Sequence, residues 1–351
     1  MLRIVIVTRG DPHTVSGGFL YHRRVAELAP EEGASVRFAS VPPRALPLAV
    51  AAGPAVLRAA ARDADVVVVD SLASHALGPL LLVARRWLPP LVGSVHQVLG
   101  GSDGPRWRRT VLTAADRLAW RACRALVVPS RHLADQLAAS GVRTPAHVAS
   151  PGSDLAAEDP AGPVPDLRRG RRIAVLCAAN WHARKGITAL LDAVARLPPD
   201  AVTVHLAGNE DVEPDYRDAV LARVEVLGDR VVRHGTVAPE RMGALYRGAD
   251  VFVLASTAEP YGIVYGEAMS AGLPVVGWAA GNLPALVDDG VEGRVLPTGD
   301  VDALAAALRE LADDEPVRRR MGTAARRRAA QLPTWRDTTR RFVEACRAAA
   351  R

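Results

Sequence analysis

The sequence is poor in cysteine and in long uncharged apolar runs, and these absences exclude several classes of protein. Its 351 residues contain only three cysteines, Cys123, Cys177 and Cys346, which are scattered along the chain. This spacing fits neither a disulfide framework nor a metal-binding knuckle. No apolar run is long enough and free enough of charge to span a bilayer. The apolar run at residues 2–7 is too short for a signal sequence, so we expect a cytoplasmic protein.

Lysine is almost absent, since Lys185 is the only lysine among 44 lysines and arginines. In such an arginine-rich chain a lone lysine indicates a site that needs a compact ammonium rather than a planar guanidinium. Residues 1–165 hold 18 basic and 13 acidic residues and carry most of the net charge of +6. A solvated arginine-rich surface explains this excess, and contact with anionic lipid is the alternative. Because no recognisable nucleic-acid-binding module is present, we expect no nucleic-acid partner.

The chain is long enough for two domains and shows an alternation of strand and helix in both halves. Apolar residues make up 49% of the chain, which excludes global disorder. Short apolar strands followed by helical patterns predict parallel sheets covered by helices. The expected strands are residues 2–8, 36–39, 66–69, 91–95 and 126–128 in the first half, and 173–177, 202–207, 231–234, 251–254 and 273–278 in the second. Residues 41–54 are expected to form a loop or an irregular helix.

The stretch Ala255–Pro274, ASTAEPYGIVYGEAMSAGLP, has the strongest pattern in the chain. It continues the strand 251–254 into a loop in which Pro260 and Gly262 prevent a helix. Glu259 lies on this loop, and Glu267 lies on a helix that begins near residue 263. The free N–H groups at the start of such a helix bind anions, and ligands bind at the carboxyl ends of strands. Two carboxylates beside an anion site favour a ligand with a diphosphate and several diols, such as a nucleotide sugar.

This stretch resembles the signature of a known enzyme family. Glu259-Pro260-Tyr261-Gly262 followed by Glu267, within E-P-Y-G…E-A-M-x-x-G-x-P-V-V, is similar to the signature of retaining GT-B glycosyltransferases of the GT4 type, and the resemblance extends from end to end of the chain. It implies a GT-B fold of the α/β class, with two Rossmann-like α/β/α domains facing a central cleft and a C-terminal helix crossing back to the first domain. The implied activity moves a hexose from a nucleotide-diphosphate sugar to an acceptor hydroxyl with retention of the anomeric configuration.

The resemblance implies a donor site in the second half of the chain. Glu267 would bind the ribose diol, Glu259 the hydroxyls of the hexose, and Lys185 the diphosphate. The family usually has an arginine five residues before this lysine, where this chain has Asn180. Either the neighbouring Arg184 supplies the missing charge or Asn180 only donates and accepts hydrogen bonds. Further donor contacts are implied for Gly235, Tyr261, Gly262, Ile263 and Val264, and charge on the leaving diphosphate would be stabilised by Lys185 and the amides of Gly262–Val264.

Two features of the first half are candidates for the rest of the site. His96 follows the strand 91–95, where a side chain is placed for chemistry, and it matches the position of the family histidine that contacts the donor sugar. A packing role is the alternative. Gly17 and Gly18 follow the first strand, and the resemblance implies that they let the backbone approach the sugar or the acceptor. A tight turn without a ligand is an equal alternative. His22 is expected at a surface or packing position.

The expected domains are residues 1–160 on the acceptor side, residues 161–334 for the nucleotide sugar, and a helix at 335–351 that packs on the first domain. Residues 156–170 have the mixed composition of a linker. Ser130 is expected to cap a helix over 131–139, and residues 302–330 to form a mostly solvated helix. The Asp288-Asp289 pair is expected in a turn. We expect no metal and no cofactor, with UDP or GDP as the nucleotide of the co-substrate.

Alternatives to a transferase remain at this stage. A nicotinamide-dependent dehydrogenase is disfavoured because neither half contains G-x-G-x-x-G. A GT-B sugar-nucleotide epimerase would need no acceptor, and an inactive subunit would bind sugar nucleotide in support of a partner. The acceptor is not specified. The mixed arginines and tryptophans of residues 85–87 and 106–109 favour a lipid-linked or cell-surface glycan, reached through peripheral contact of the N-terminal domain with the inner face of the membrane, over a small molecule.

Overall fold

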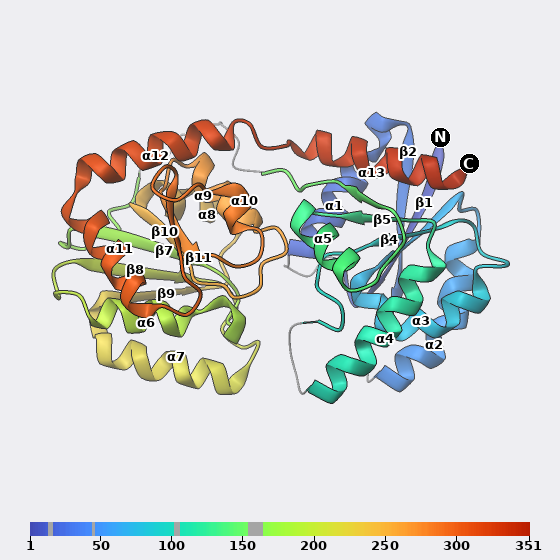
Figure 1. Cartoon of the computed structure of the whole chain (residues 1–351), viewed down its shortest axis with the longest axis horizontal. Helices are drawn as coiled ribbons and strands as arrows, with labels where there is room; N and C mark the ends of the chain where they lie inside the picture. Colours follow the sequence, from blue (N-terminus) through green and yellow to red (C-terminus); the bar gives the residue numbers. More distant parts are fainter. Residues whose placement is uncertain (13–16, 44–45, 102–105, 154–163) are drawn as a thin grey trace. The chain divides into compact units, whose positions relative to one another are not determined.

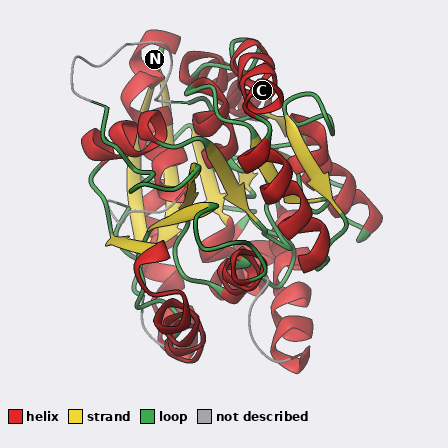
Figure 2. Ribbon diagram, turned by 90° about the vertical axis from the view of Figure 1, so that its left-hand side faces the viewer, coloured by secondary structure: helices red, strands yellow, loops and turns green. Residues whose placement is uncertain are grey.

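The computed structural model describes residues 1–12, 17–43, 46–101, 106–153 and 164–351 (Figure 1). The chain divides into two compact units. Unit 1 consists of Met1–Gly152 together with Pro333–Arg351, and unit 2 consists of Ser153–Leu332. The division follows Gly152, whereas the sequence analysis placed the boundary after residue 160. Residue 160 and part of the expected linker lie outside the described residues. In Figure 2 strands lie in the interior and helices lie outside them.

Unit 1 contains a six-stranded parallel sheet in the order β2-β1-β3-β4-β5-β6. The chain passes from β1 to β2 on one side and then returns to place β3 on the other side of β1. The order of the strands therefore reverses between β1 and β3, and in such sheets ligands bind at the carboxyl ends of the strands at this switch point. The strands are β1 (Leu2–Arg9), β2 (Ala34–Val41), β3 (Val66–Asp70), β4 (Leu91–Ser94), β5 (Ala125–Val128) and β6 (Ala146–Val148).

Helices cover both faces of this sheet (Figures 1 and 2). They are α1 (Gly17–Leu28), α2 (Leu46–Ala61), α3 (Ser71–Ala84), α4 (Arg106–Ala122) and α5 (Arg131–Ala139), with a short 3₁₀ helix η1 (Ala29–Glu32). Helix α2 contacts α3, and α3 packs against α4. Of the two alternatives for residues 41–54, a loop or an irregular helix, the structure has a helix from residue 46 onward with Pro54 inside it, and this helix buries Ala49, Leu57 and Ala60. Ser130 caps α5 as predicted, with its hydroxyl accepting from Leu133 N–H.

Helix α13 (Trp335–Ala350) packs within unit 1 although it lies at the far end of the sequence. It contacts α1 and η1 and also β3, β4, β5 and β6. Thr334 and Asp337 form a capping box at its start, and Trp335, Phe342 and Cys346 are buried. The helix therefore covers strands of the unit 1 sheet with an apolar face.

Unit 2 contains a second six-stranded parallel sheet, in the order β12-β11-β10-β7-β8-β9. The chain moves outward from β7 through β8 to β9 and then places β10 on the other side of β7, so this switch point lies between β7 and β10. The strands are β7 (Ile173–Ala178), β8 (Val202–Ala207), β9 (Val231–Gly235), β10 (Val251–Leu254), β11 (Val275–Trp278) and β12 (Gly293–Leu296).

The helices of unit 2 correct one prediction. They are η2 (Ala183–Lys185), α6 (Ile187–Ala195), α7 (Pro214–Leu227), η3 (Gly228–Arg230), α8 (Pro239–Gly248), α9 (Ile263–Ser270), α10 (Leu283–Leu286), α11 (Val301–Asp313) and α12 (Glu315–Ala329). The expected single solvated helix at 302–330 is two helices, because Asp314 ends α11 and caps α12. Helix α11 buries Leu304, Leu308 and Leu311, which share one face. No helix among the described residues is long and apolar enough to cross a membrane.

Candidate functional site

Lys185 and Glu259 form an ion pair at the switch point of unit 2. Lys185 ends η2, which follows β7, and Glu259 lies in the loop that follows β10. The ammonium of Lys185 donates a hydrogen bond to Oε2 of Glu259. The two side chains are 14% and 13% exposed, so the pair is largely shielded from water and its charges interact more strongly than at a surface. Strand order thus brings together two residues that the sequence separately assigned to the donor site.

Backbone contacts tie the Lys185 turn to the end of β10. Gly186 has a φ of 68°, and a Cβ there would lie 2.0 Å from the carbonyl oxygen of Ala255. The carbonyl of Arg184 accepts hydrogen bonds from Thr257 N–H at 2.8 Å and from the Ser256 hydroxyl at 3.1 Å. Only glycine fits this close approach without displacing the backbone, so the glycine that follows Lys185 has a geometric cause.

The turn after β11 supports the other side of the Glu259 loop. Gly281 has a φ of 59°, and a Cβ there would lie 2.4 Å from the carbonyl oxygen of Glu259. That carbonyl accepts from Asn282 N–H at 2.9 Å, and the Asn282 side chain donates to the Tyr261 carbonyl at 3.2 Å. The turn after β11 is thus bonded to the Glu259 loop through both its backbone and a side chain. In the structure it holds the Glu259 loop in place.

The Glu259 loop leads directly into helix α9. Gly262 has a φ of 86°, and a Cβ there would meet the Tyr265 ring at 2.2 Å. Ile263 and Val264 are the first residues of α9, where N–H groups have no acceptor within the helix. Tyr261 is buried, and burial raises its pKa to about 12, so its phenol remains protonated at neutral pH. The arrangement offers backbone N–H donors beside the Lys185–Glu259 pair.

Glu267, four residues into α9, accepts a hydrogen bond from the hydroxyl of Tyr246 at 2.8 Å. Burial raises the pKa of Tyr246 well above its ordinary value, and the neighbouring Glu267 carboxylate adds to the shift. The tyrosine therefore stays a donor and orients the carboxylate. Gly235, at the end of β9, has a φ of 60° and accepts from Gly208 N–H at 2.8 Å.

Asn180 does not reproduce the charge that the family usually has at its position. Its Oδ1 accepts from Asn209 N–H at 3.0 Å, which ties it to the turn after β8. Arg184 donates through Nη1 to the Ala258 carbonyl at 3.2 Å, and its Nε is buried without a hydrogen-bond partner among the described residues. The cationic groups of this turn are thus Arg184 and Lys185.

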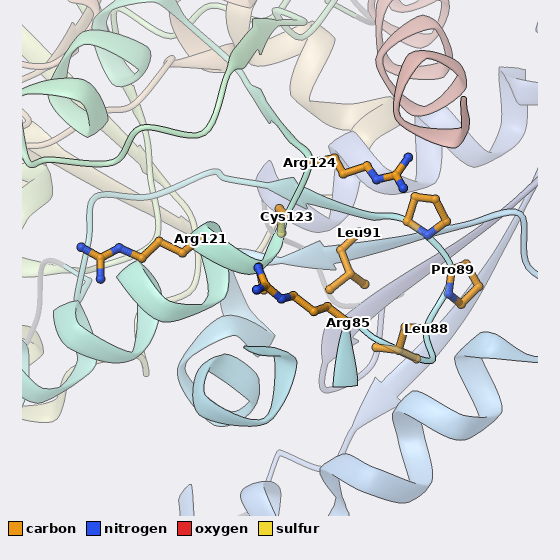
Figure 3. Close-up of a pocket in the computed structure, with 9 residues that line it drawn as sticks. Arg85, Leu88, Pro89, Leu91, Arg121, Cys123 and Arg124 are labelled. Carbon is orange, nitrogen blue, oxygen red and sulfur yellow. The ribbon is translucent and has the colours of Figure 1, made fainter. Parts of the chain in front are cut away.

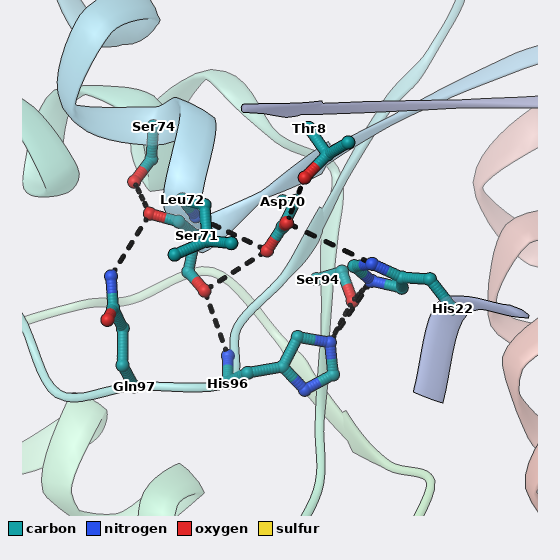
Figure 4. A network of polar contacts seen from close by, with 9 residues as sticks. All are labelled: Thr8, His22, Asp70, Ser71, Leu72, Ser74, Ser94, His96 and Gln97. Carbon is teal, nitrogen blue, oxygen red and sulfur yellow. Dashed lines mark hydrogen bonds and ion pairs between the residues drawn. The ribbon is translucent and has the colours of Figure 1, made fainter. Parts of the chain in front are cut away.

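Unit 1 places His96 in a polar cluster at the carboxyl ends of β1, β3 and β4 (Figure 4). Nε2 of His96 lies 2.9 Å from the Ser94 hydroxyl and 3.1 Å from Nε2 of His22. Asp70 accepts from the Thr8 hydroxyl at 2.6 Å across the switch point. The prediction of a surface or packing position for His22 missed this cluster, in which the histidine is fully buried and 3.0 Å from the Ser94 hydroxyl.

Both imidazoles of the cluster are held in the neutral form. Burial lowers the pKa of His22 to about 3 and that of His96 to about 3, with His22 adding to the shift of His96 and Asp70 opposing it. Burial also raises the pKa of Asp70. His22, Asp70 and His96 offer one potential metal ligand each within 4.8 Å of one another. Oδ2 of Asp70 lies 3.9 Å from Nδ1 of His22, and Nε2 of His96 lies 3.1 Å from Nε2 of His22.

Other parts of unit 1 add little to this site. Gly17 and Gly18 begin helix α1, and residues 13–16 before them lie outside the described residues. A hollow of about 260 Å³ lies at the amino ends of β4 and β5, opposite the end that leads to His96 (Figure 3). Arg85, Arg121 and Arg124 are among its lining residues, and no predicted site residue is.

Comparisons with known proteins cover both halves of the chain. Residues 2–152 match the family described as glycosyl transferase 4-like domain, and residues 172–314 match glycosyl transferases group 1. The chain is 31% identical over 267 residues to D-inositol 3-phosphate glycosyltransferase of Xylanimonas cellulosilytica, covering 70% of this chain and 63% of the relative. It is 33% identical over 180 residues to MMP alpha-(1->4)-mannosyltransferase of Mycolicibacterium hassiacum, covering 50% and 43%. The chain thus matches less than two thirds of the length of these curated relatives.

Solved structures resemble the whole chain in fold. Sucrose-phosphate synthase from Thermosynechococcus elongatus has a TM-score of 0.83 at 21% identity, with 99% of both chains covered. Anabaena HepE in complex with UDP and glucose has a TM-score of 0.80 at 23% identity, with 99% of this chain and 100% of that chain covered. Together with the two family matches, these likenesses confirm the GT-B fold class and the predicted family. The chain belongs to the group 1 glycosyl transferases of the GT4 type.

Proposed function

We propose that this protein transfers a hexose from a nucleotide-diphosphate sugar to an acceptor hydroxyl with retention of the anomeric configuration. The observation that carries the proposal is the shielded Lys185–Glu259 pair, which lies at the switch point of unit 2 beside the start of α9. A cation and backbone N–H groups suit a diphosphate, and nearby carboxylates suit the hydroxyls of a sugar. One donor molecule contains both chemical groups.

Each donor-binding residue has one role in the proposal. The diphosphate binds Lys185 and the first N–H groups of α9. Because Lys185 then no longer pairs with Glu259, the Glu259 carboxylate can accept hydrogen bonds from the hexose. Glu267, oriented by Tyr246, accepts from the ribose diol. Arg184 supplies the second positive charge in place of the arginine that is Asn180 here. Gly235, at the end of β9, and Tyr261, just before α9, complete the donor contacts.

The chemical step breaks the bond between the anomeric carbon and the diphosphate oxygen and forms a bond from that carbon to the acceptor oxygen. The bonding electrons leave with the diphosphate, and Lys185 and the α9 amides stabilise the charge that develops there. As the new bond forms, the acceptor hydroxyl passes its proton to the departing diphosphate oxygen, which lies on the same face of the hexose. Retention requires the acceptor to enter on the face from which the diphosphate leaves. In this proposal His96 forms a hydrogen bond with a hydroxyl of the hexose. Gly17 and Gly18 let the backbone come close to the acceptor.

The first experiment is a thermal-shift panel of UDP-, GDP- and ADP-sugars. Wild type, Glu267→Ala and the control Glu225→Ala are compared, since Glu225 is exposed on α7. A ligand at about 100 times its Kd stabilises the folded protein by roughly 2.7 kcal/mol. We expect a UDP- or GDP-sugar to shift wild type and the control, with Glu267→Ala losing the shift. No shift with any sugar nucleotide in wild type contradicts the donor site proposed here. UDP is the first choice because HepE has been solved with UDP and glucose.

We further propose that helix α4 contacts an anionic membrane surface that carries the acceptor. Trp107 and Val111 lie four residues apart and are 71% and 58% exposed, and arginines surround them at 106, 108 and 109. The only acidic residue of α4, Asp116, is buried and bonds Ser74. Exposed apolar and cationic side chains without exposed acids suit the interface of an anionic bilayer.

Vesicle sedimentation tests this contact. Wild type is expected to bind phosphatidylserine-containing vesicles and to leave them at high salt, and Trp107→Ser together with Arg108→Gln is expected to bind less. Equal binding to phosphatidylcholine vesicles, or unchanged binding by the double variant, contradicts the proposal.

A further inference from the structure

We propose that Glu213 is a positioning residue for the phosphate-binding corner of unit 2, defined as residues 182–186. It acts by holding His182 and Ala183, and through them it places Lys185 for the donor diphosphate. This inference rests on the function proposed above. Glu213 lies outside the family signature, and its position before Pro214 at the start of α7 gives no sign of such a role in the sequence.

Both oxygens of the Glu213 carboxylate are used in the contact. Nδ1 of His182 lies 2.7 Å from Oε1, and the backbone N–H of Ala183 donates to Oε2 at 3.0 Å. The contact joins residues that are 31 and 30 positions apart in the sequence. Two hydrogen bonds accepted by one carboxylate fix both the distance and the orientation of the corner relative to the start of α7.

The residues that Glu213 holds are those that shape the turn before Lys185. The carbonyl of His182 accepts from Lys185 N–H at 2.8 Å, and the carbonyl of Ala183 accepts from Gly186 N–H at 3.2 Å. The opposite side of the corner is fixed to the loop after β10 through the Arg184 carbonyl. The corner is therefore held by two separate sets of contacts, one from Glu213 and one from the loop after β10.

The charge of Glu213 suits this role. Burial opposes its ionisation, but the hydrogen bonds from Ala183 N–H and His182, together with the positive charge of Arg184, lower the pKa of Glu213 below its usual value. The carboxylate is therefore ionised at neutral pH and both contacts persist. Because Asn180 contributes no charge, the diphosphate depends on Lys185 and Arg184, and both belong to the corner that Glu213 holds.

The test compares Glu213→Ala and Glu213→Gln with the control Glu225→Ala. UDP and GDP binding is measured by isothermal titration calorimetry, and hydrogen–deuterium exchange of peptides over 181–187 is measured without ligand. We expect Glu213→Ala to lower the affinity for nucleotide about tenfold and to speed hydrogen exchange in the corner. Glu213→Gln keeps one acceptor oxygen, so its affinity and exchange should lie between those of wild type and Glu213→Ala. Glu225→Ala is expected to match wild type in both measurements.

A double-mutant cycle with Lys185→Ala separates positioning from general destabilisation. If Glu213 acts through Lys185, Glu213→Ala causes no further loss of nucleotide affinity when Lys185 is already alanine. Equal losses in the two backgrounds overturn the inference, as does unchanged corner exchange in Glu213→Ala. Loss of affinity in Lys185→Ala but not in Glu213→Ala overturns the inference alone. Failure of wild type to bind either nucleotide overturns the proposed function and this inference together.

Discussion

The Lys185 ammonium donates a hydrogen bond to the Glu259 carboxylate, and this contact joins the two loops on either side of the unit 2 switch point. The two residues are 74 positions apart in the sequence. In the proposed function, a donor diphosphate competes with Glu259 for Lys185. Binding of the diphosphate and release of the hexose-binding carboxylate are then one event.

This competition predicts a change in the reactivity of Lys185. Because it is the only lysine of the chain, an amine reagent has Lys185 and the α-amino group as its targets. We expect UDP or GDP to slow labelling of Lys185 while leaving the α-amino group unaffected, as measured by peptide mass spectrometry. Glu259→Gln should weaken the ion pair and speed labelling in the absence of nucleotide. Labelling of Lys185 that is independent of nucleotide would refute the assignment.

The close approach at Gly186 predicts a large loss of stability on adding one methyl group. Gly186→Ala would combine a left-handed backbone with a 2.0 Å contact to Ala255, and we expect it to destabilise unit 2 by about 3 kcal/mol or more. Gly33→Ala is the matched control, since Gly33 has a φ of 68° and a ψ of 31°, close to those of Gly186, and the nearest atom to the added Cβ is 3.9 Å away. The control should lose only about 1–2 kcal/mol. Similar melting temperatures for both variants would show that the close approach is relieved by a small backbone shift.

The buried hydroxyl of Tyr246 predicts a specific effect on nucleotide binding. Tyr246→Phe removes the donor to Glu267 and leaves the ring, so we expect UDP or GDP affinity to fall roughly three- to tenfold. Tyr265→Phe is the comparison, because Tyr265 is also buried and donates instead to the Leu254 carbonyl at 3.3 Å. Calorimetric titration should show a greater loss for Tyr246→Phe. Equal losses would mean that the hydroxyl does not orient Glu267.

The histidine cluster predicts how stability depends on pH. The pKa of His22 is about 3 in the folded chain, below its ordinary value of 6.5, so below pH 6.5 the unfolded chain binds more protons than the folded one. The stabilisation is present above pH 6.5 and is lost as the pH falls from 6.5 toward 3. The loss for one such imidazole is roughly 2 kcal/mol between pH 7 and pH 5. His22→Gln should flatten this part of the curve of melting temperature against pH, and an unchanged slope would exclude His22 as its source.

Sequence patterns predicted much of the fold because the governing forces are local. The strands at 202–207 and 251–254 have the bounds expected from their apolar runs. The cap at Ser130 follows from a hydroxyl that can reach the N–H group of Leu133. The sequence left residues 41–54 open between a loop and an irregular helix, because the burial of Leu57 that stabilises helix α2 is a tertiary effect. The division of residues 301–329 into two helices was missed because the sequence pattern does not distinguish Asp314 from the other polar residues of a helix surface.

The sequence by itself determined which chemical groups stand at the ends of strands. Glu259, Glu267, Lys185 and His96 follow strands at fixed local spacing, and turn-forming residues place them there regardless of the rest of the chain. The tertiary structure decided which of these groups meet. The contacts of Glu213 with His182 and of His22 with His96 have no local signal, because they depend on the order of strands and the packing of helices. Parallel pairing of β10 with β7 sets Glu259 beside Lys185, and that pairing is a long-range choice made by burial of both strands in one core.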